Sequence, residues 1–209
     1  KEITPKSQTM KRSFFSNIDG KNSVLKKRII ALCINEDGYS IADLSKELNT
    51  SIPTITKIVG ELMDEGFLVD MGKLGTNGGR RPSIYGLNPS AGYFVGTDVK
   101  KKSISIAVTN FKGHTVDYLE ELPFTVQNSE ESFRELCSTI KKYLSDNGID
   151  PSEVLAYGVN LTGRVNNETG YCFSYFIGED RPISAFLKEE LQAEVFVEND
   201  SRAMTYGEY

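Results

Sequence analysis

Apolar residues recur at helical spacing in two short stretches of the first half of the chain. Residues 41–48 carry one apolar face, and Ser40 just before them is a good helix N-cap. A second stripe predicts another helix, capped by Thr50 or Ser51. We therefore expect two short amphipathic helices joined by a tight turn. Their apolar positions are Ile41, Leu44, Leu48, Ile55, Ile58, Val59 and Leu62.

Two strand-like segments follow these helices, at residues 67–71 and 83–87. The loop between them is rich in glycine and carries Arg80 and Arg81. This order predicts a winged helix-turn-helix domain over residues 23–88, a fold that places its second helix in the DNA major groove. The alternative is an ordinary helical hairpin with a solvated polar face. The strand pair and its basic loop favour DNA binding.

The polar side of the second helix supplies candidate DNA contacts. Small side chains near its start can approach base edges and the thymine methyl group, and a lysine further along can meet a phosphate. An arginine pair held in a loop suits a narrow, electronegative minor groove. The candidate DNA-binding residues are Ser51, Pro53, Thr54, Lys57, Arg80 and Arg81.

The chain before this region divides into an arm and a helix. Residues 1–22 are polar and form either a flexible arm or an anchor that packs on the body. A helix is expected over residues 23–35, with Val24, Ile29, Leu32 and Cys33 available to the core. Its basic residues are expected on an exposed face, where they either touch phosphates or are solvated. They are Lys26, Lys27 and Arg28.

Beyond a linker at residues 88–92, strand and helix patterns alternate through residues 93–209. The order is three strands, a helix, a strand, a helix and a strand. It predicts an α/β domain of the actin-like, ribonuclease H-like ATPase type, which we expect to be incomplete at its C-terminus. Strands are expected over residues 93–99, 103–109, 115–124, 155–161 and 195–198, and helices over 129–147 and 183–191.

Charge is divided unevenly between these two parts. Residues 1–90 carry 13 Lys and Arg against 10 Asp and Glu, a net charge of +3, whereas residues 91–209 carry 11 against 19, a net charge of −8. A mildly basic DNA reader joined to an acidic body fits a regulator better than a protein that coats DNA.

The composition gives further expectations about membrane association, disulfides and cellular location. No apolar run is long enough to span a membrane. Cys33, Cys137 and Cys172 are far apart and form neither a disulfide framework nor a metal-binding motif. We therefore expect a cytoplasmic protein with no membrane partner.

Five short motifs occur in a fixed order along the chain: Gly79-Arg80-Arg81-Pro82, Tyr85-Gly86-Leu87-Asn88, Gly96-Thr97-Asp98, residues 158–165 and residues 195–200. In this order and spacing they resemble the ROK family of sugar-responsive repressors and sugar kinases. The chain is similar to the repressor branch, which joins an N-terminal winged helix to a sugar-kinase-like body. The resemblance covers most of residues 23–209.

The resemblance implies a sugar site at Asn199 and Asp200. In ROK kinases the corresponding residues hold sugar hydroxyls, and the aspartate is the general base. Thr162 and Gly163 match the family segment that lines the same cleft. A carboxylate beside a carboxamide suits a polyol, because one only accepts hydrogen bonds and the other also donates them. The alternative is that Asp200 merely caps the helix expected from about Ser201.

The phosphate site departs from the family pattern. ROK kinases follow the first-strand aspartate with two glycines and a threonine, whose N–H groups cradle the ATP phosphates. Here Asp98 is followed by Val99, and Lys100 and Lys101 stand where the glycines should be. We therefore expect no catalysis and no cofactor in this chain. The family's structural zinc site would lie beyond residue 209.

Together these patterns indicate a DNA-binding transcriptional repressor of carbohydrate genes. It would bind double-stranded operator DNA as a homo-oligomer, a dimer or a tetramer. A sugar or sugar-phosphate bound in a non-catalytic kinase-like domain would control its affinity for the operator. The first alternative is an ATP-dependent ROK-type sugar kinase with an appended DNA-binding module. The second is a DNA-binding scaffold whose body no longer binds sugar.

Overall fold

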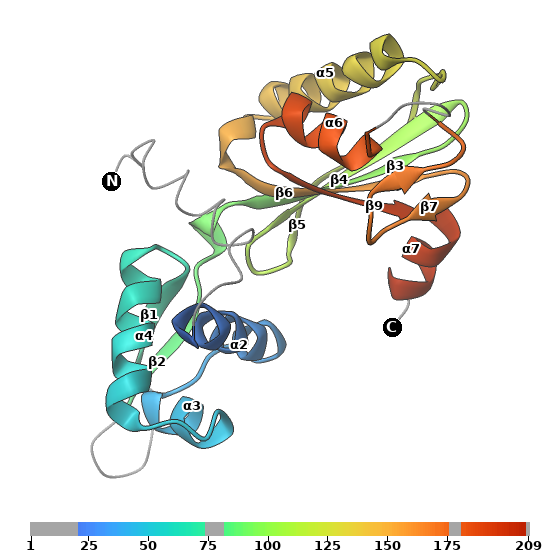
Figure 1. The fold of residues 1–209 in the computed structure, drawn as a ribbon. Coiled ribbons are helices and arrows are strands. Elements are labelled where there is room, and N and C mark those ends of the chain that lie inside the picture. The colour runs from blue at the N-terminus through green and yellow to red at the C-terminus, as the bar shows by residue number, and fades with distance from the viewer. Residues whose placement is uncertain (1–20, 74–81, 176–180, 208–209) are drawn as a thin grey trace. The chain divides into compact units, whose positions relative to one another are not determined.

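The computed structural model describes residues 21–73, 82–175 and 181–207 (Figure 1). The chain forms two compact units. The first contains the residues up to Ala91 together with Phe111–Gly113, and the second contains the rest of the chain. We describe each unit by itself.

In its described residues, the first unit consists of three helices followed by a two-stranded hairpin. The strands pair antiparallel, and a bridge between Tyr39 and Tyr85 adds a short third strand through two reciprocal backbone hydrogen bonds of 2.9 Å. A helix-turn-helix followed by a hairpin is the arrangement of a winged helix-turn-helix, so the predicted fold is confirmed. The elements are α2 (Lys21–Asn35), α3 (Ile41–Glu47), α4 (Ile52–Asp64), β1 (Leu68–Lys73) and β2 (Ser83–Leu87).

The starts of α3 and α4 follow from the residues that precede them. The Ser40 hydroxyl accepts a hydrogen bond from the Asp43 backbone N–H at 3.2 Å, which satisfies one of the free donors of α3. Before α4, the Ser51 hydroxyl lies 2.9 Å from the Thr54 hydroxyl and makes no capping bond to the backbone. Pro53 occupies the first turn, where its missing N–H removes no helical bond. The predicted apolar stripe of α4 is buried at Ile55, Ile58, Val59 and Leu62.

The buried face of α2 differs from the predicted one. Ile29, Ile30 and Cys33 are buried, whereas Val24 is 51% exposed. Together with Lys26, the three buried positions follow the i, i+3, i+4, i+7 spacing of one helix face. The inward face therefore includes Lys26, and Val24 lies on the opposite side. The predicted core position of Val24 was wrong, and those of Ile29 and Cys33 are confirmed.

Lys26 was expected on an exposed face, and the structure corrects this as well. Its side chain is 12% exposed, and its Nζ lies 2.9 Å from Glu61 Oε2 and 2.5 Å from Glu65 Oε1. Burial lowers the pKa of Lys26, but the hydrogen bonds and charges of the two glutamates outweigh it, so the net shift is upward. Lys26 thus joins α2 to α4 and is committed to an ion pair rather than to a DNA phosphate.

Replacing Lys26 with methionine should destabilise the first unit by about 1–3 kcal/mol, because two partly buried glutamates lose their cation. Hydrogen exchange of α4 amides measures the free energy of local opening. The raised pKa means that the contribution of Lys26 is fully present below 10.5 and is lost as pH rises through the higher folded value. Lys27→Met is the control, since no ion pair of Lys27 is found in the described residues. Equal protection in both variants would contradict this role of Lys26.

The second unit is a five-stranded sheet in the order β5-β4-β3-β6-β9, with α5 and α6 packed on one face (Figure 1). Strands β3, β6 and β9 are parallel, and β4 and β5 run antiparallel to their neighbours. The core lies between the sheet and the two helices and includes Phe133, Tyr157 and Phe186. The bounds are β3 (Tyr93–Val99), β4 (Ser103–Asn110), β5 (Thr115–Pro123), α5 (Glu130–Asp146), β6 (Val154–Leu161), α6 (Ile183–Leu191), β9 (Glu194–Asn199) and α7 (Asp200–Gly207).

These bounds confirm the predicted α/β order, with β3 and α6 ending at the predicted residues. One feature was not predicted, a small hairpin made of β7 (Val165–Asn166) and β8 (Tyr171–Cys172). Strands of two residues are too short to show an alternating apolar pattern. Two 3₁₀ turns, at Pro89–Ala91 and Pro151–Glu153, complete the described elements.

The three cysteines are free and buried. Burial raises the pKa of the Cys33 thiol to about 11. Burial is also the main reason that the pKa of Cys137 rises to about 12. Both thiols therefore stay protonated near neutral pH and behave as small core residues.

Candidate nucleic-acid interface and ligand pocket

The outward side of α4 is a polar surface concentrated at the start of the helix. Ser51, Pro53, Thr54 and Lys57 are all exposed, while the opposite side of the helix is buried. The Lys57 side chain is 70% exposed, and its Nζ is 3.9 Å from Glu61 Oε1, a loose contact in water. These four predicted residues lie together on one accessible face. A long cation is thus placed about one helical turn from two small hydroxyl side chains.

Ile52 belongs to the same surface, although sequence reasoning did not select it. Its side chain is 55% exposed at the first position of α4. It lies three residues before the buried Ile55, which is the spacing of one helix face. The sequence signal for its exposure was its position next to the N-cap. The first residue of a helix lies beyond the core that covers the middle of the helix. An exposed isoleucine there can contact a thymine methyl group.

Arg80 and Arg81 lie outside the described residues. The strands on either side, β1 and β2, pair antiparallel, with a register shift between Asp70 and Lys73. The contact of these two arginines with DNA remains a prediction from the sequence.

A second site lies at the carboxyl ends of the parallel strands β3, β6 and β9. Asp98, Asn160 and Glu198 are aligned across these strands by the sheet register. Ligands of open α/β sheets usually bind beyond such strand ends. Burial raises the pKa of the Asp98 carboxyl, Lys100 opposes the shift, and the negative charge of Asp200 adds to it. Asp98 and Asp200 therefore interact electrostatically at this edge of the sheet.

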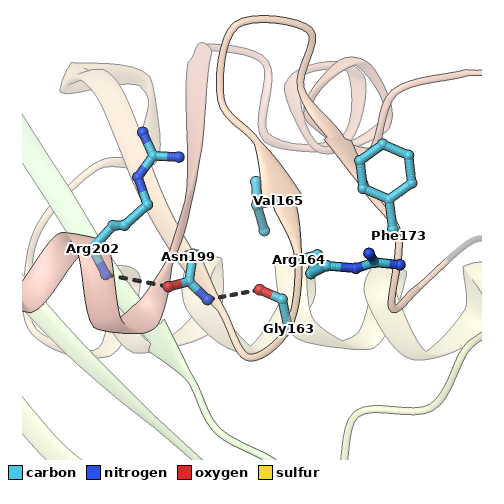
Figure 2. A pocket seen from close by; sticks show the side chains of 6 residues that line it. All are labelled: Gly163, Arg164, Val165, Phe173, Asn199 and Arg202. Atoms are coloured by element: carbon cyan, nitrogen blue, oxygen red, sulfur yellow. Dashed lines mark hydrogen bonds between the residues drawn. The ribbon is translucent and has the colours of Figure 1, made fainter.

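A pocket of about 520 Å³ opens beside this edge (Figure 2). Its volume is in the range typical of small-molecule sites. The walls come from the loop after β6, from the β7–β8 hairpin and from the start of α7. The residues that line it are Gly163, Arg164, Val165, Phe173, Asn199 and Arg202.

Asn199 holds two walls of the pocket together. Its Nδ2 donates hydrogen bonds to the Gly163 carbonyl at 2.6 Å and to Asp200 Oδ1 at 2.9 Å. Its Oδ1 accepts the Arg202 backbone N–H at 3.2 Å, as the dashed lines of Figure 2 show in part. Both Nδ2 hydrogens are thus engaged within the protein, and only the second lone pair of Oδ1 remains for a ligand.

The structure brings the four predicted sugar-binding residues into one region but not all into the pocket. Gly163 and Asn199 line it, whereas Thr162 and Asp200 do not. Thr162 is exposed and its hydroxyl is 3.4 Å from the Val99 carbonyl. Asp200 Oδ1 accepts the N–H of the next residue, Ser201, at 2.7 Å, whereas the bond typical of a helix N-cap is made by Asn199 Oδ1, which accepts the Arg202 N–H at 3.2 Å. Sugar binding by these residues stays a prediction.

Four pocket residues were missed by sequence reasoning: Arg164, Val165, Phe173 and Arg202. Two of them, Arg164 and Val165, follow Gly163 directly inside a motif that sequence analysis had selected. Phe173 lies on the hairpin that was not predicted. Arg202 could have been found from helical geometry, because it lies three residues after Asn199.

The turn after Val99, where the family resemblance predicts the phosphate site, is a short hairpin between β3 and β4. Lys100 donates its backbone N–H to the Ser103 carbonyl at 2.9 Å, and its Nζ pairs with Glu121 at 3.2 Å. Lys101 and Lys102 are exposed. The hydrogen bond to Glu121 is the main cause that raises the pKa of Lys100. The backbone here closes a turn, so at least one of its N–H groups is used internally.

Among the described residues, no group of three or more His, Cys, Asp or Glu is arranged to hold a metal ion. None of the helices in the described part is both long and apolar enough to cross a bilayer.

Comparison with known proteins gives matches to both units. A family model for winged helix-turn-helix DNA-binding domains matches residues 23–69. The chain is 26% identical to a xylose repressor of Bacillus subtilis (strain 168) over 187 residues, 88% of this chain and 48% of the repressor. It is 23% identical to a xylose repressor of Caldicellulosiruptor bescii over 196 residues, 90% of this chain and 49% of the repressor. The chain thus spans about half the length of the curated relatives it matches.

A solved structure shares the fold. It is described as a ROK family transcriptional regulator, a homologue of the E. coli MLC protein. The match has a TM-score of 0.63 at 19% identity and covers 98% of this chain and 48% of that chain. At this sequence identity the match shows that the fold is shared and shows nothing more.

Proposed function

We propose that this chain, a ROK-family protein of the repressor type by its sequence relatives and its fold, represses carbohydrate genes by binding their operators. The observation that carries the proposal is the exposed polar start of α4, which presents Ser51, Thr54 and Lys57 beside the exposed Ile52. In a winged helix-turn-helix this part of the second helix meets base edges in the major groove. The wing residues Arg80 and Arg81 would add minor-groove contacts.

A sugar or sugar-phosphate in the pocket would control the affinity for the operator. Because coupling between two sites is reciprocal, such a sugar must bind the DNA-free and DNA-bound forms with different affinities, and the operator must change sugar affinity by the same factor. The relatives are named xylose repressors, so xylose is the first sugar to test. The working form would be a cytoplasmic homo-oligomer whose symmetry matches a palindromic operator.

We propose that the body binds without catalysis and needs no cofactor. The repressor relatives support a regulator, and the lysine-rich turn at Lys100–Lys102 lacks the glycines that let a backbone approach ATP phosphates. The presence of both Asp98 and Asp200 favours a sugar kinase as the second candidate. A coupled assay of ATP-dependent sugar phosphorylation separates the two, and turnover above that of an Asp200→Asn variant would establish the kinase.

Capture of fragmented genomic DNA from the source organism by the purified full chain, followed by sequencing, tests the repressor proposal. At near-physiological salt we expect recovery of a few palindromic sites near carbohydrate genes, because specific contacts outcompete phosphate binding there. Addition of the controlling sugar should change the yield of those sites and of no others. Uniform recovery of the genome would show non-specific binding only and would contradict the proposal.

A further inference from the structure

The described residues that line the pocket carry positive charge. Arg164 and Arg202 are cationic, and no described lining residue is acidic. We infer that this pocket takes a negatively charged sugar, either a sugar phosphate or a sugar acid, rather than a neutral one. The inference rests on the proposed sugar control and narrows it to one chemical class. An arginine guanidinium carries several donors in a planar fork that matches phosphate and carboxylate oxygens.

Arg202 is oriented by a carboxylate behind it. Its Nε is 3.5 Å from Glu198 Oε1, and the same oxygen accepts the Asn199 backbone N–H at 2.8 Å. The other Glu198 oxygen accepts the Asn167 side-chain amide at 2.8 Å. Glu198 is therefore held by three donors and fixes the Nε edge of Arg202. The terminal nitrogens of the guanidinium are the donors left for a ligand.

Arg164 has an anchored backbone and an uncommitted charge. Its backbone N–H donates to the Ser174 hydroxyl at 3.3 Å, and its carbonyl accepts the Phe173 N–H at 2.8 Å. Within the described ranges no ion pair involves its guanidinium, which Figure 2 shows below the Phe173 ring. The loop thus presents an unneutralised cation from a fixed position. A guanidinium without an ion-pair partner gains more interaction energy from a bound anion than one that is already paired.

Asp200, the acidic residue between Asn199 and Arg202 in sequence, is hydrogen-bonded within the protein through one carboxylate oxygen. Asp200 Oδ1 accepts bonds from Asn199 Nδ2 at 2.9 Å and from the Ser201 N–H at 2.7 Å. In the first turn of α7, the Ser201 N–H donates to Asp200 Oδ1 and the Arg202 N–H donates to Asn199 Oδ1. These two N–H groups are therefore not available to an anion at the helix start. The two arginines are left as the recognising groups for an anion.

Phe173 supplies the part of the pocket that suits a sugar ring. Its side chain is 55% exposed, although an aromatic ring of this size is usually buried. Together with Val165 it offers an apolar surface against which the C–H face of a pyranose or furanose can pack. An apolar wall beside two arginines matches a molecule that has a sugar face and a charged end.

The test compares matched neutral and charged probes on the full chain by calorimetry and thermal shift. The probes are xylose, glucose, glucose 6-phosphate, glucuronate, ribose, ribose 5-phosphate and inorganic phosphate. We expect a charged sugar to bind at least about tenfold more tightly than its neutral partner. Arg164→Gln and Arg202→Gln should each lower that affinity about tenfold or more and should lower the affinity for the neutral sugar much less. Lys142→Gln, which removes one exposed charge from α5 away from the pocket, should change nothing.

Each other outcome overturns the inference in a distinguishable way. Preference for xylose, glucose or ribose, unaffected by the arginine variants, would identify a neutral-sugar pocket and would leave the repressor proposal standing. Binding of inorganic phosphate as tightly as of any sugar phosphate would remove the sugar from the assignment. Failure of every sugar to bind, with operator binding intact, would overturn both the inference and the proposed sugar control. Specific operator binding is measured separately, so its loss cannot be mistaken for either result.

Discussion

Replacing Thr54 with glutamate should remove specific DNA binding and leave α4 at least as stable as before. Thr54 is the third residue of α4 and its hydroxyl lies 2.9 Å from that of Ser51, the residue before the helix. A glutamate there completes a capping box with Ser51 and places negative charge at the positive end of the helix, both of which stabilise a helix. The same carboxylate would face the phosphates and base edges of a bound operator.

Repulsion at this position should lower operator affinity on the order of 100-fold, about 2.7 kcal/mol. Fluorescence anisotropy with a recovered operator measures the loss, and thermal unfolding measures the stability of the variant. The control is Ser138→Glu, which adds the same charge to an exposed position of α5 in the second unit. If both variants bind the operator like the parent chain, the start of α4 does not read DNA.

Replacing Gly163 with alanine should disable the pocket. Gly163 has a φ of +119°, a conformation that side chains rarely adopt, and a Cβ there would run directly into the Ser174 hydroxyl. Backbone strain alone costs on the order of 1–3 kcal/mol. The Gly163 carbonyl accepts Asn199 Nδ2, so movement of this loop would also loosen Asn199 and, through it, the start of α7. We expect affinity for the pocket's sugar to fall on the order of tenfold or more.

Gly148→Ala is the matched control, because Gly148 also has a positive φ, +74°, but open space where a Cβ would stand. It should lower stability by about 1–2 kcal/mol without changing sugar affinity. Adding Ser174→Gly to Gly163→Ala should recover part of the lost affinity, since it relieves the collision but not the backbone strain. Calorimetric titration gives the affinities and thermal unfolding the stabilities. Equal sugar affinity in the Gly163 and Gly148 variants would show that the loop does not shape the pocket.

Much of the fold could be read from local patterns. The period of apolar residues predicted α4 with its buried stripe, and the alternation of Ile104, Ile106 and Val108 predicted β4, in which all three are buried. Such patterns are legible because each element must turn its apolar side away from water, which repeats at 3.6 residues in a helix and at 2 in a strand. Ser40 could be recognised in the same way, since a cap acts on its own helix.

Local patterns failed where the neighbour of a side chain is distant in the sequence. Lys26 points inward because Glu61 and Glu65 on α4 lie opposite it, and nothing within α2 reveals those partners. Ile52 has the spacing of a core residue but is exposed because it begins the helix at the edge of the core. The period of apolar residues identifies one face of a helix. Tertiary packing determines which other element, if any, covers that face.

The candidate sites likewise differ in whether they depend on residues close together or far apart in the sequence. The order of elements, the motif ending in Asn199 and Asp200, and the polar start of α4 were already present in the amino-acid pattern, because each depends on residues close together in the chain. The pocket could not be read there. Arg164, Phe173 and Arg202 come from separate segments, and they meet because the register of β6 with β9 places the loop after one beside the helix after the other. Long-range strand pairing is set by the folded sheet as a whole, so the charge of the pocket became visible only in three dimensions.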